Sequence, residues 1–172
     1  MMDQFPLKEI AVPVLKVKLQ VEPPIPGCIP PAWLLNDHYN ENAVHKDVLT
    51  RPSPQLKIYQ EAWQKGELIY VTMRAEESNE LVGYATLFLR PHPHYGVPVA
   101  VDDLHYLVPH LRSLGLGKML IEFAEREAAA RGAKIICMRD KAGQEHAPMW
   151  DKMGYRLTDL VYTKDLRDVA VD

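Results

Sequence analysis

A single glycine-rich turn near the middle of the chain constrains the fold more than any other feature of the sequence. Residues 112–117 read RSLGLG, after a strand-like segment that ends at Leu107 and before a long amphipathic segment. A glycine-rich turn that leads into a helix gathers unpaired backbone N–H groups and the positive end of the helix dipole, and this combination binds phosphate or pyrophosphate. Arg112 adds a fixed positive charge. The sequence therefore predicts a strand, an anion-binding turn and a helix in succession.

Two commoner glycine motifs do not fit this turn. A P-loop needs a glycine where Arg112 stands, and Ser or Thr where Met119 stands. A dinucleotide-binding fingerprint needs a third glycine at the position of Leu120. The remaining alternative is a plain turn without a ligand, whose glycines only allow positive φ. The strand-like and helix-like segments on either side argue against this alternative.

Composition bounds the class of protein. A chain of 172 residues with 47% hydrophobic and 25% charged residues indicates one globular domain over 1–172, with 1–31 as an N-terminal strand and proline-rich loop and 32–166 as the core. A net charge of −3 gives no support for nucleic-acid binding, and no apolar run reaches the length of a membrane span. Cys28 and Cys137 lack metal-type spacing, so we expect a cytoplasmic protein with reduced thiols, in which Cys137 is a buried apolar residue.

Alternation, glycine and proline predict the order of the elements. Residues 15–22 alternate apolar and polar, as a half-buried strand does, and the proline-rich stretch 23–31 is a loop. Ser53 is expected to cap a helix whose first position is Pro54 and which stops at Gly66. The other expected elements are a short helix at 32–42, strands at 68–73, 81–89 and 99–107, helices at 115–131 and 146–153, a buried parallel strand at 133–138 and a final strand at 155–166.

The turn and its flanks resemble the GNAT superfamily of N-acyltransferases. In that superfamily R/Q-x-x-G-x-G/A at a strand-to-helix junction is the coenzyme A pyrophosphate loop, and residues 112–117 match it. Residues 149–155, MWDKMGY, are similar to the family helix that ends in F-Y-E-K-L-G-F. The resemblance covers nearly the whole chain. It implies an α/β (α+β) fold, with a mixed central sheet splayed between its fourth and fifth strands and flanked by helices, and acetyl-CoA as cofactor.

The resemblance also implies where coenzyme A binds. The end of the strand before the turn would hydrogen-bond the pantetheine arm through its backbone, and the turn would hold the pyrophosphate. Many family members carry a tyrosine that protonates the leaving thiolate where this chain has Trp150, whose indole N–H supplies no proton at neutral pH. A thiol with a pKa of about 8.5 is a tolerable leaving group without such an acid. The implied cofactor residues are His105, Tyr106, Leu107, Arg112, Ser113, Leu114, Gly115, Leu116, Gly117, Lys118 and Trp150.

Acyl transfer to an amine needs a group that takes the amine proton and a donor for the developing oxyanion. Period-2 alternation over 99–107 places Val101, Asp103, His105 and Leu107 on one face of the strand. Asp103 and His105 are therefore the predicted catalytic pair, acting directly or through a water. The alternatives are a solvated carboxylate for Asp103 and, for His105, a histidine satisfied by a backbone carbonyl.

Two further groups of residues are candidates for binding the acceptor. One follows the first expected helix, and the other lies on the turn between the third and fourth strands, which we expect at or near the same end of the sheet. A proline-stiffened turn is the alternative for the second group. Its two histidines with Asp103 would imitate a zinc site, but the cofactor needs no metal and none is expected. The candidates are His38, Tyr39, Glu41, His92, His94 and Tyr95, and the nearby carboxylates of Asp37, Glu41, Asp102 and Asp103 would favour a cationic amine.

Residues 37–41, 90–95 and 101–107 more closely resemble a group of GNAT-type proteins encoded in bacteriophage genomes. We expect an N-acetyltransferase that transfers the acetyl group of acetyl-CoA to a primary amine by direct attack in a ternary complex. The acceptor would be a small molecule or a protein. Trp150 keeps a second interpretation open, a non-catalytic coenzyme A-binding interaction protein or virion-associated protein. A homodimer is compatible with either interpretation, and no nucleic-acid or membrane partner is expected.

Overall fold

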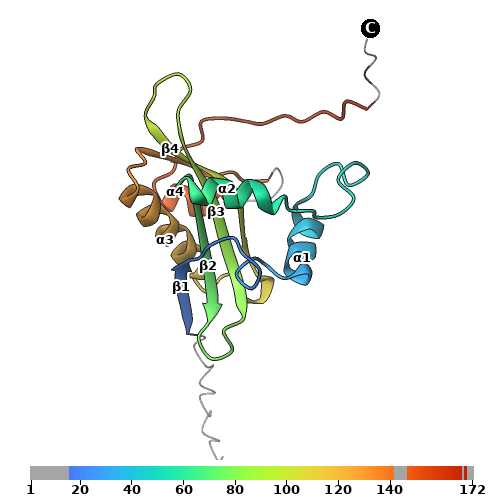
Figure 1. Ribbon diagram of the computed structural model, residues 1–172, viewed down its shortest axis with the longest axis vertical. Coiled ribbons are helices and arrows are strands. Elements are labelled where there is room, and N and C mark those ends of the chain that lie inside the picture. Colours follow the sequence, from blue (N-terminus) through green and yellow to red (C-terminus); the bar gives the residue numbers. More distant parts are fainter. Residues whose placement is uncertain (1–15, 142–146, 168, 170–172) are drawn as a thin grey trace, which may run out of the picture.

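A five-stranded mixed sheet forms the centre of the molecule (Figure 1). The computed structural model describes residues 16–141, 147–167 and 169. Neighbouring strands pair antiparallel from β1 to β4, and β4 and β5 pair parallel, so the sheet is mixed as the sequence predicts. The strands, in spatial order, are β1 (Val17–Val21), β2 (Leu68–Ala75), β3 (Leu81–Pro91), β4 (Pro98–Leu107) and β5 (Ile135–Cys137).

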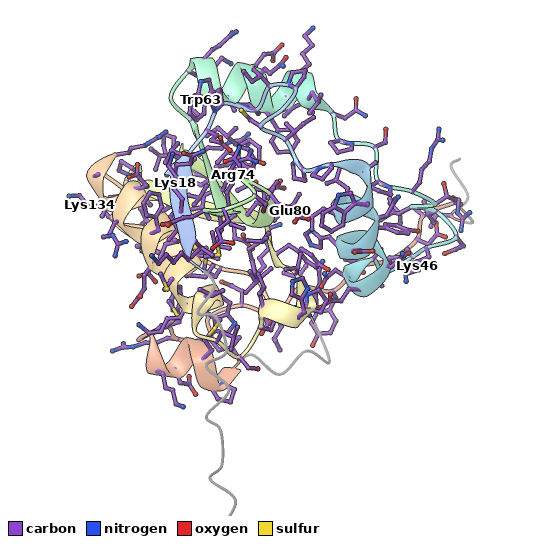
Figure 2. The ribbon with its side chains drawn as sticks, turned by 90° about the horizontal axis from the view of Figure 1, so that it is seen from below. Lys18, Lys46, Trp63, Arg74, Glu80 and Lys134 are labelled. Atoms are coloured by element: carbon purple, nitrogen blue, oxygen red, sulfur yellow. The ribbon has the colours of Figure 1, made fainter. Side chains whose placement is uncertain are left out.

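Helices cover both faces of this sheet. α1 (Ala32–Asn42) and α2 (Leu56–Gln64) lie on one side, and α3 (Leu116–Ala130) and α4 (Ala147–Lys152) lie on the other (Figure 2). A single 3-10 turn, η1 (Pro109–Leu111), follows β4. Within the described part of the chain, no helix has the length and apolar character needed to cross a membrane.

The core forms where strand residues meet the apolar faces of the helices. β2 is buried along its whole length, because it lies inside the sheet with both faces covered. α3 packs Leu120, Ala124 and Ala128 against the sheet at helical spacing. Truncating the buried Leu120 side chain to alanine would cost about 2–5 kcal/mol of stability. This packing fixes α3, and with it the glycine-rich turn, beside the end of β4.

α2 begins later than the sequence predicts. Gln55, not Ser53, precedes the helix, and no side chain caps it. The N–H of Leu56 donates to the carbonyl of Pro54 at 3.0 Å, and this tight turn holds Gln55 at ψ 77°, outside the helical region. Gly66 ends the segment with a φ of +73°, as expected.

The C-terminal part of the sheet differs most from expectation. The predicted strand 133–138 is shortened to β5, and both Ile135 and Cys137 are exposed, so the expectation of a buried strand with a buried Cys137 is wrong. The predicted final strand 155–166 is also wrong, because this segment forms no strand and extends away from the sheet (Figure 1). β5 offers only three residues for pairing, and polar contacts with the loop after α1 hold the segment elsewhere. Thr163 Oγ1 lies 2.9 Å from His45 Nε2, and Arg167 forms an ion pair with Asp47.

Candidate active site

The N-terminus of α3 presents backbone donors to open space. Gly115 precedes the helix with a φ of +78°, and Ser113 has a φ of +66°, so the turn winds in the left-handed region that the glycine-rich sequence permits. No capping side chain accepts from the first turn of the helix. A Cβ built on Gly117 would meet nothing closer than Leu107 Cδ2 at 3.9 Å. The room beside these N–H groups fits a pyrophosphate, and the glycine keeps it open.

Among the other predicted residues of the turn, some side chains are buried in the core and others are exposed to solvent. Leu116 is buried and faces the core, whereas the Leu114 side chain is 64% exposed. Lys118 forms an ion pair with Glu122 one turn further along α3. Ser113, Leu114 and Lys118 therefore offer the anion their backbone rather than a preformed cluster of side chains.

Arg112 points away from the turn. Its guanidinium donates from Nη1 and Nη2 to the two carboxylate oxygens of Glu41 at 2.5 and 2.7 Å, and its Nε donates to the carbonyl of Leu107 at 2.9 Å. It also lies over the ring of Tyr106. The ion pair with Arg112 holds the pKa of the Glu41 carboxyl below its ordinary value. Arg112 thus ties α1 to the end of β4, which leaves the anion to the backbone of the turn.

A gap opens between β4 and β5 beyond their short ladder. The two strands pair only from Val99 with Ile135 to Val101 with Cys137, although β4 continues to Leu107. The β5-facing edge of His105, Tyr106 and Leu107 has no strand partner among the described residues. Extended backbone with free polar groups can accept another extended chain. The expectation of a sheet splayed between its fourth and fifth strands is confirmed.

The buried Asp102 and the half-buried His105 form a pair near the closed end of this gap. Asp102 is only 2% exposed, and its Oδ2 lies 3.0 Å from His105 Nδ1 and 3.4 Å from the backbone N of Arg139. No donor within the described residues reaches Asp102 Oδ1. Trp150 of α4 stands edge-on to the His105 ring at 5.9 Å, while its indole N–H donates to Asp140 at 3.1 Å. The one donor of Trp150 is thereby used within the protein.

Asp103 faces the opposite side of β4. Its Oδ2 accepts a hydrogen bond of 2.8 Å from the hydroxyl of Tyr59 on α2. The ladder between β3 and β4 shifts at this point, since Thr86 opposes Leu104 and Leu87 opposes Asp102, which leaves Asp103 as the extra residue of a β-bulge. The bulge breaks the period-2 alternation. The prediction that Asp103 and His105 share a face is therefore wrong.

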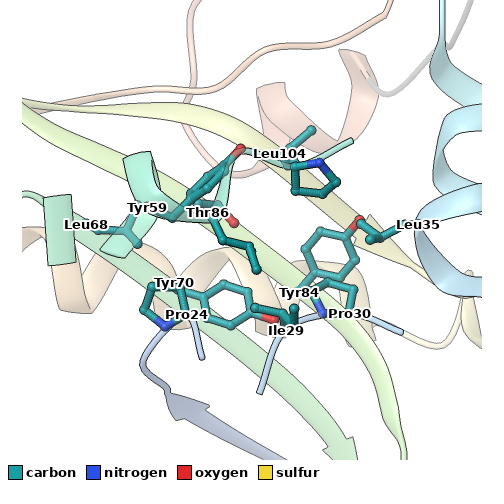
Figure 3. Close-up of a pocket in the computed structure, with 12 residues that line it drawn as sticks. Pro24, Ile29, Pro30, Leu35, Tyr59, Leu68, Tyr70, Tyr84, Thr86 and Leu104 are labelled. Atoms are coloured by element: carbon teal, nitrogen blue, oxygen red, sulfur yellow. The ribbon is translucent and has the colours of Figure 1, made fainter. Parts of the chain in front are cut away.

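An open cleft borders Asp103 on the α2 side of the sheet. It encloses about 540 Å³, and its lining residues include Asp102, Asp103, Arg90 and Arg139. A second, apolar pocket lies beside it beneath α1 and α2, and Tyr59 lines both (Figure 3). Burial raises the pKa of Asp103, although the hydrogen bond from Tyr59 acts in the opposite direction. A partly buried carboxylate at the floor of a cleft is suited to accept a proton.

The predicted acceptor residues lie at two ends of β4. His38 is buried, lies 2.6 Å from the Tyr84 hydroxyl through Nδ1 and stacks on Tyr106, and burial lowers its pKa to about 4. Tyr39 contacts Lys46 in the loop after α1. The rings of His92, His94 and Tyr95 instead gather on the exposed β3–β4 turn.

The β-ladder register shows how far apart these groups are. Pro98 opposes Pro91 beside the β3–β4 turn, whereas Tyr106 opposes Tyr84 beside α1. These two points are eight residues apart on β4, or about 27 Å at ~3.4 Å per residue. The expectation that both groups share one end of the sheet is wrong. Across the described ranges, no three His, Cys, Asp or Glu side chains are grouped as a metal ion would need.

Two residues of the site were not predicted. Asp102 was expected only as a nearby acidic group, and Tyr59 was not among the candidates. The electrostatic expectation also changes, because Glu41 is paired with Arg112 and Asp102 with His105. An acidic residue three positions before a histidine on one strand would have drawn attention to Asp102, but only with knowledge of the bulge.

A mixed sheet that splays beside an uncapped helix N-terminus is the arrangement that the resemblance to coenzyme A-dependent acyltransferases implies. The family profile for the acetyltransferase (GNAT) family matches residues 34–155, which is most of the chain. The chain belongs to this family, and its activity class is acetyl transfer from acetyl-CoA. No curated protein sequence matches the chain.

Solved acetyltransferases share the fold at low sequence identity. An aminoglycoside acetyltransferase from an uncultured soil metagenomic sample is similar with a TM-score of 0.66 and 16% identity over 88% of this chain and 99% of that chain. A Trypanosoma brucei acetyltransferase gives a TM-score of 0.61 and 18% identity over 88% and 100%. A ribosomal-protein-alanine N-acetyltransferase from Brucella melitensis gives 0.60 and 15% over 87% and 98%.

Proposed function

We propose that this protein acetylates a primary amine that enters the cleft beside Asp103, by direct attack on acetyl-CoA in a ternary complex. The observation that carries the proposal is the position of Asp103 on the β-bulge, at the floor of the cleft and level with the closed end of the β4–β5 gap. Acetyl-CoA supplies the acetyl group as a thioester. The pantetheine arm fits the free edge of β4, and the pyrophosphate fits the N-terminus of α3.

The residues of the cleft can take up the amine proton. Asp103 lies where an amine in the cleft would meet the strand, and its raised pKa makes it a better proton acceptor than an exposed carboxylate. The hydroxyl of Tyr59 fixes the carboxylate orientation. The bulge leaves one residue of β4 outside the ladder, and a backbone N–H at this point would stabilise the developing oxyanion.

The acceptor is proposed only as an amine. Similar structures are described as acting on aminoglycosides, on ribosomal-protein alanine and on glucosamine-6-phosphate, and an amino group is what these acceptors share. The cleft of this chain carries both carboxylates and arginines, so it favours no strongly cationic acceptor. Residues 37–41, 90–95 and 101–107 resemble bacteriophage-encoded GNAT-type proteins, and this resemblance supports a relationship of the chain to that group.

The test is acetyl-CoA-dependent thiol release with a panel of amines that includes small polyamines, aminoglycosides and N-terminal peptides. Asp103→Asn should lower kcat about a hundredfold or more with the best amine, because the proton acceptor is lost. Its affinity for coenzyme A, measured by calorimetry, should be unchanged. Leu114→Ala, on an exposed side chain of the turn, is the matched control and should keep its turnover.

Two outcomes would contradict the proposal. Unchanged turnover in Asp103→Asn would remove this carboxylate from the reaction. Coenzyme A binding without thiol release across the whole panel would favour the non-catalytic binding protein instead.

A further inference from the structure

We infer that His105, held in place by Asp102, is the proton donor to the departing coenzyme A thiolate in this protein. This inference rests on the proposed function. It assigns the two sides of β4 to two proton transfers, with Asp103 receiving the amine proton on the α2 side and His105 supplying the thiolate proton on the α4 side. His105 is the catalytic residue of this step, and Asp102 is a positioning residue.

The first step of the argument is the location of the pair. An extended arm that starts at the N-terminus of α3 and follows the free edge of β4 runs from Leu107 towards Val101. The gap closes at the pairing of Val101 with Cys137, so the reactive end of the arm stops beside Asp102. Asp102 and His105 are joined at 3.0 Å at that point.

The second step is the state of His105. An ionised carboxylate only accepts hydrogen bonds, so the 3.0 Å contact requires the proton of His105 on Nδ1. This leaves Nε2 as the nitrogen that exchanges a proton with a ligand. Burial alone would lower the pKa of His105, but the hydrogen bond and charge of Asp102, assisted by Asp140, raise its pKa above the ordinary value. Lys141 acts in the opposite direction, and His38 and His105 repel each other when both are charged.

The third step is that Trp150, the described aromatic residue in contact with the His105 ring, offers no proton of its own. Trp150 contacts the His105 ring edge-on, yet its indole N–H is bonded to Asp140, and an indole does not release a proton at neutral pH. The buried Oδ1 of Asp102 has no partner among the described residues, which marks the closed end of the gap as incomplete without a ligand. A ligand N–H at this atom would complete it.

The chemistry balances as follows. The amine nitrogen forms a bond to the thioester carbon, and the carbon–sulfur bond breaks with its electron pair on sulfur. Nε2 of His105 gives its proton to that sulfur, so coenzyme A leaves as the thiol. Neutral His105 takes a proton back from solvent, and Asp103 returns the amine proton to solvent.

The experiment measures the bound thiol without turnover. Coenzyme A is added to the protein, and thiolate formation is followed by ultraviolet absorbance against pH. Next to protonated His105 the thiol should ionise at least about tenfold more readily than in His105→Gln. The His105 imidazole is titrated by NMR in the free protein, and its pKa should fall in Asp102→Asn.

His110→Gln is the matched control for these titrations. It makes the same substitution at an exposed histidine outside the Asp102–His105 pair, so the thiol and His105 imidazole titrations should stay near wild type. In turnover, His105→Gln should lower kcat with little change in KM for acetyl-CoA. In wild type, kcat should fall at alkaline pH because His105 loses its proton. This fall should be missing from the pH profile of His105→Gln.

The outcomes separate this inference from the proposed function. Equal thiol titrations in wild type and His105→Gln, with coenzyme A bound in both, would overturn the role of His105 alone. An unchanged His105 pKa in Asp102→Asn would overturn the role of Asp102. If coenzyme A failed to bind the wild-type protein in the accompanying calorimetry, the proposed function itself would fail.

Discussion

The hydrogen bond from Tyr59 to Asp103 affects the pKa of the Asp103 carboxyl in the cleft. Burial raises the pKa of the Asp103 carboxyl, and the charge of Asp102 acts in the same direction. The Tyr59 hydroxyl stabilises the ionised carboxylate by donating to it and so lowers its pKa. The hydroxyl of Tyr70, which also lines the apolar pocket, donates to the carbonyl of Cys28 instead. Tyr59 therefore bonds the proposed base, whereas the more deeply buried Tyr70 does not.

Tyr59→Phe should shift the pH dependence of the reaction. A carboxylate base works only when ionised, so kcat/KM rises with pH through the pKa of Asp103. Removing the donor destabilises the ionised form and raises that pKa, which should move the acid limb to higher pH by roughly one pH unit. The measurement is kcat/KM against pH with one amine. Protonation of that amine affects every variant equally, so a difference between variants comes from the protein. Tyr70→Phe is the control, and an identical limb in Tyr59→Phe and wild type would rule out Asp103 as the base.

Local sequence signals predict where the helices and strands lie, but not which face of a strand each side chain occupies. The strand, turn and helix around residues 107–116 are confirmed, because glycine positions and apolar spacing act over a few residues. The faces of β4 are not predicted, because the bulge at Asp103 depends on the register with Thr86 and Leu87 of a neighbouring strand. A register shift of one residue moves side chains to the other face. The partnership of Asp102 with His105 is invisible to alternation for this reason.

The N-terminus of α3 can be tested by adding one charge. Gly117→Glu should keep the fold, because a Cβ there has space and an acidic group suits the first turn of a helix. The new carboxylate should repel a pyrophosphate and weaken coenzyme A binding at least about tenfold by calorimetry. Gly117→Ala adds only the methyl group and separates the effect of size from that of charge. Wild-type affinity in a folded Gly117→Glu protein would place the pyrophosphate elsewhere.

At the scale of the molecule, the central sheet is predictable and its far edge is not. β1 to β4 follow from alternation and turn residues, since each strand has a long apolar pattern and a neighbour close in sequence. Whether β5 extends and whether the segment after α4 joins the sheet depends on which distant part of the chain that segment contacts. The loop after α1 holds that segment through Thr163 and Arg167. Nothing in residues 155–166 alone distinguishes a strand in the sheet from an extended segment beside a loop.

The splayed sheet predicts a pattern of protection that spans two distant segments. Among the described residues, β4 beyond Val101 has no strand partner on its β5 side, and no side chain caps the first turn of α3. Backbone amides that gain a hydrogen-bond partner exchange more slowly. Adding coenzyme A should therefore slow hydrogen exchange about tenfold or more in 103–107 and 113–118 together, as measured by mass spectrometry. β2 and the exposed turn 92–97 serve as internal controls and should exchange as before. Protection confined to the turn, or spread evenly over the sheet, would mean that the gap between β4 and β5 is not where the ligand lies.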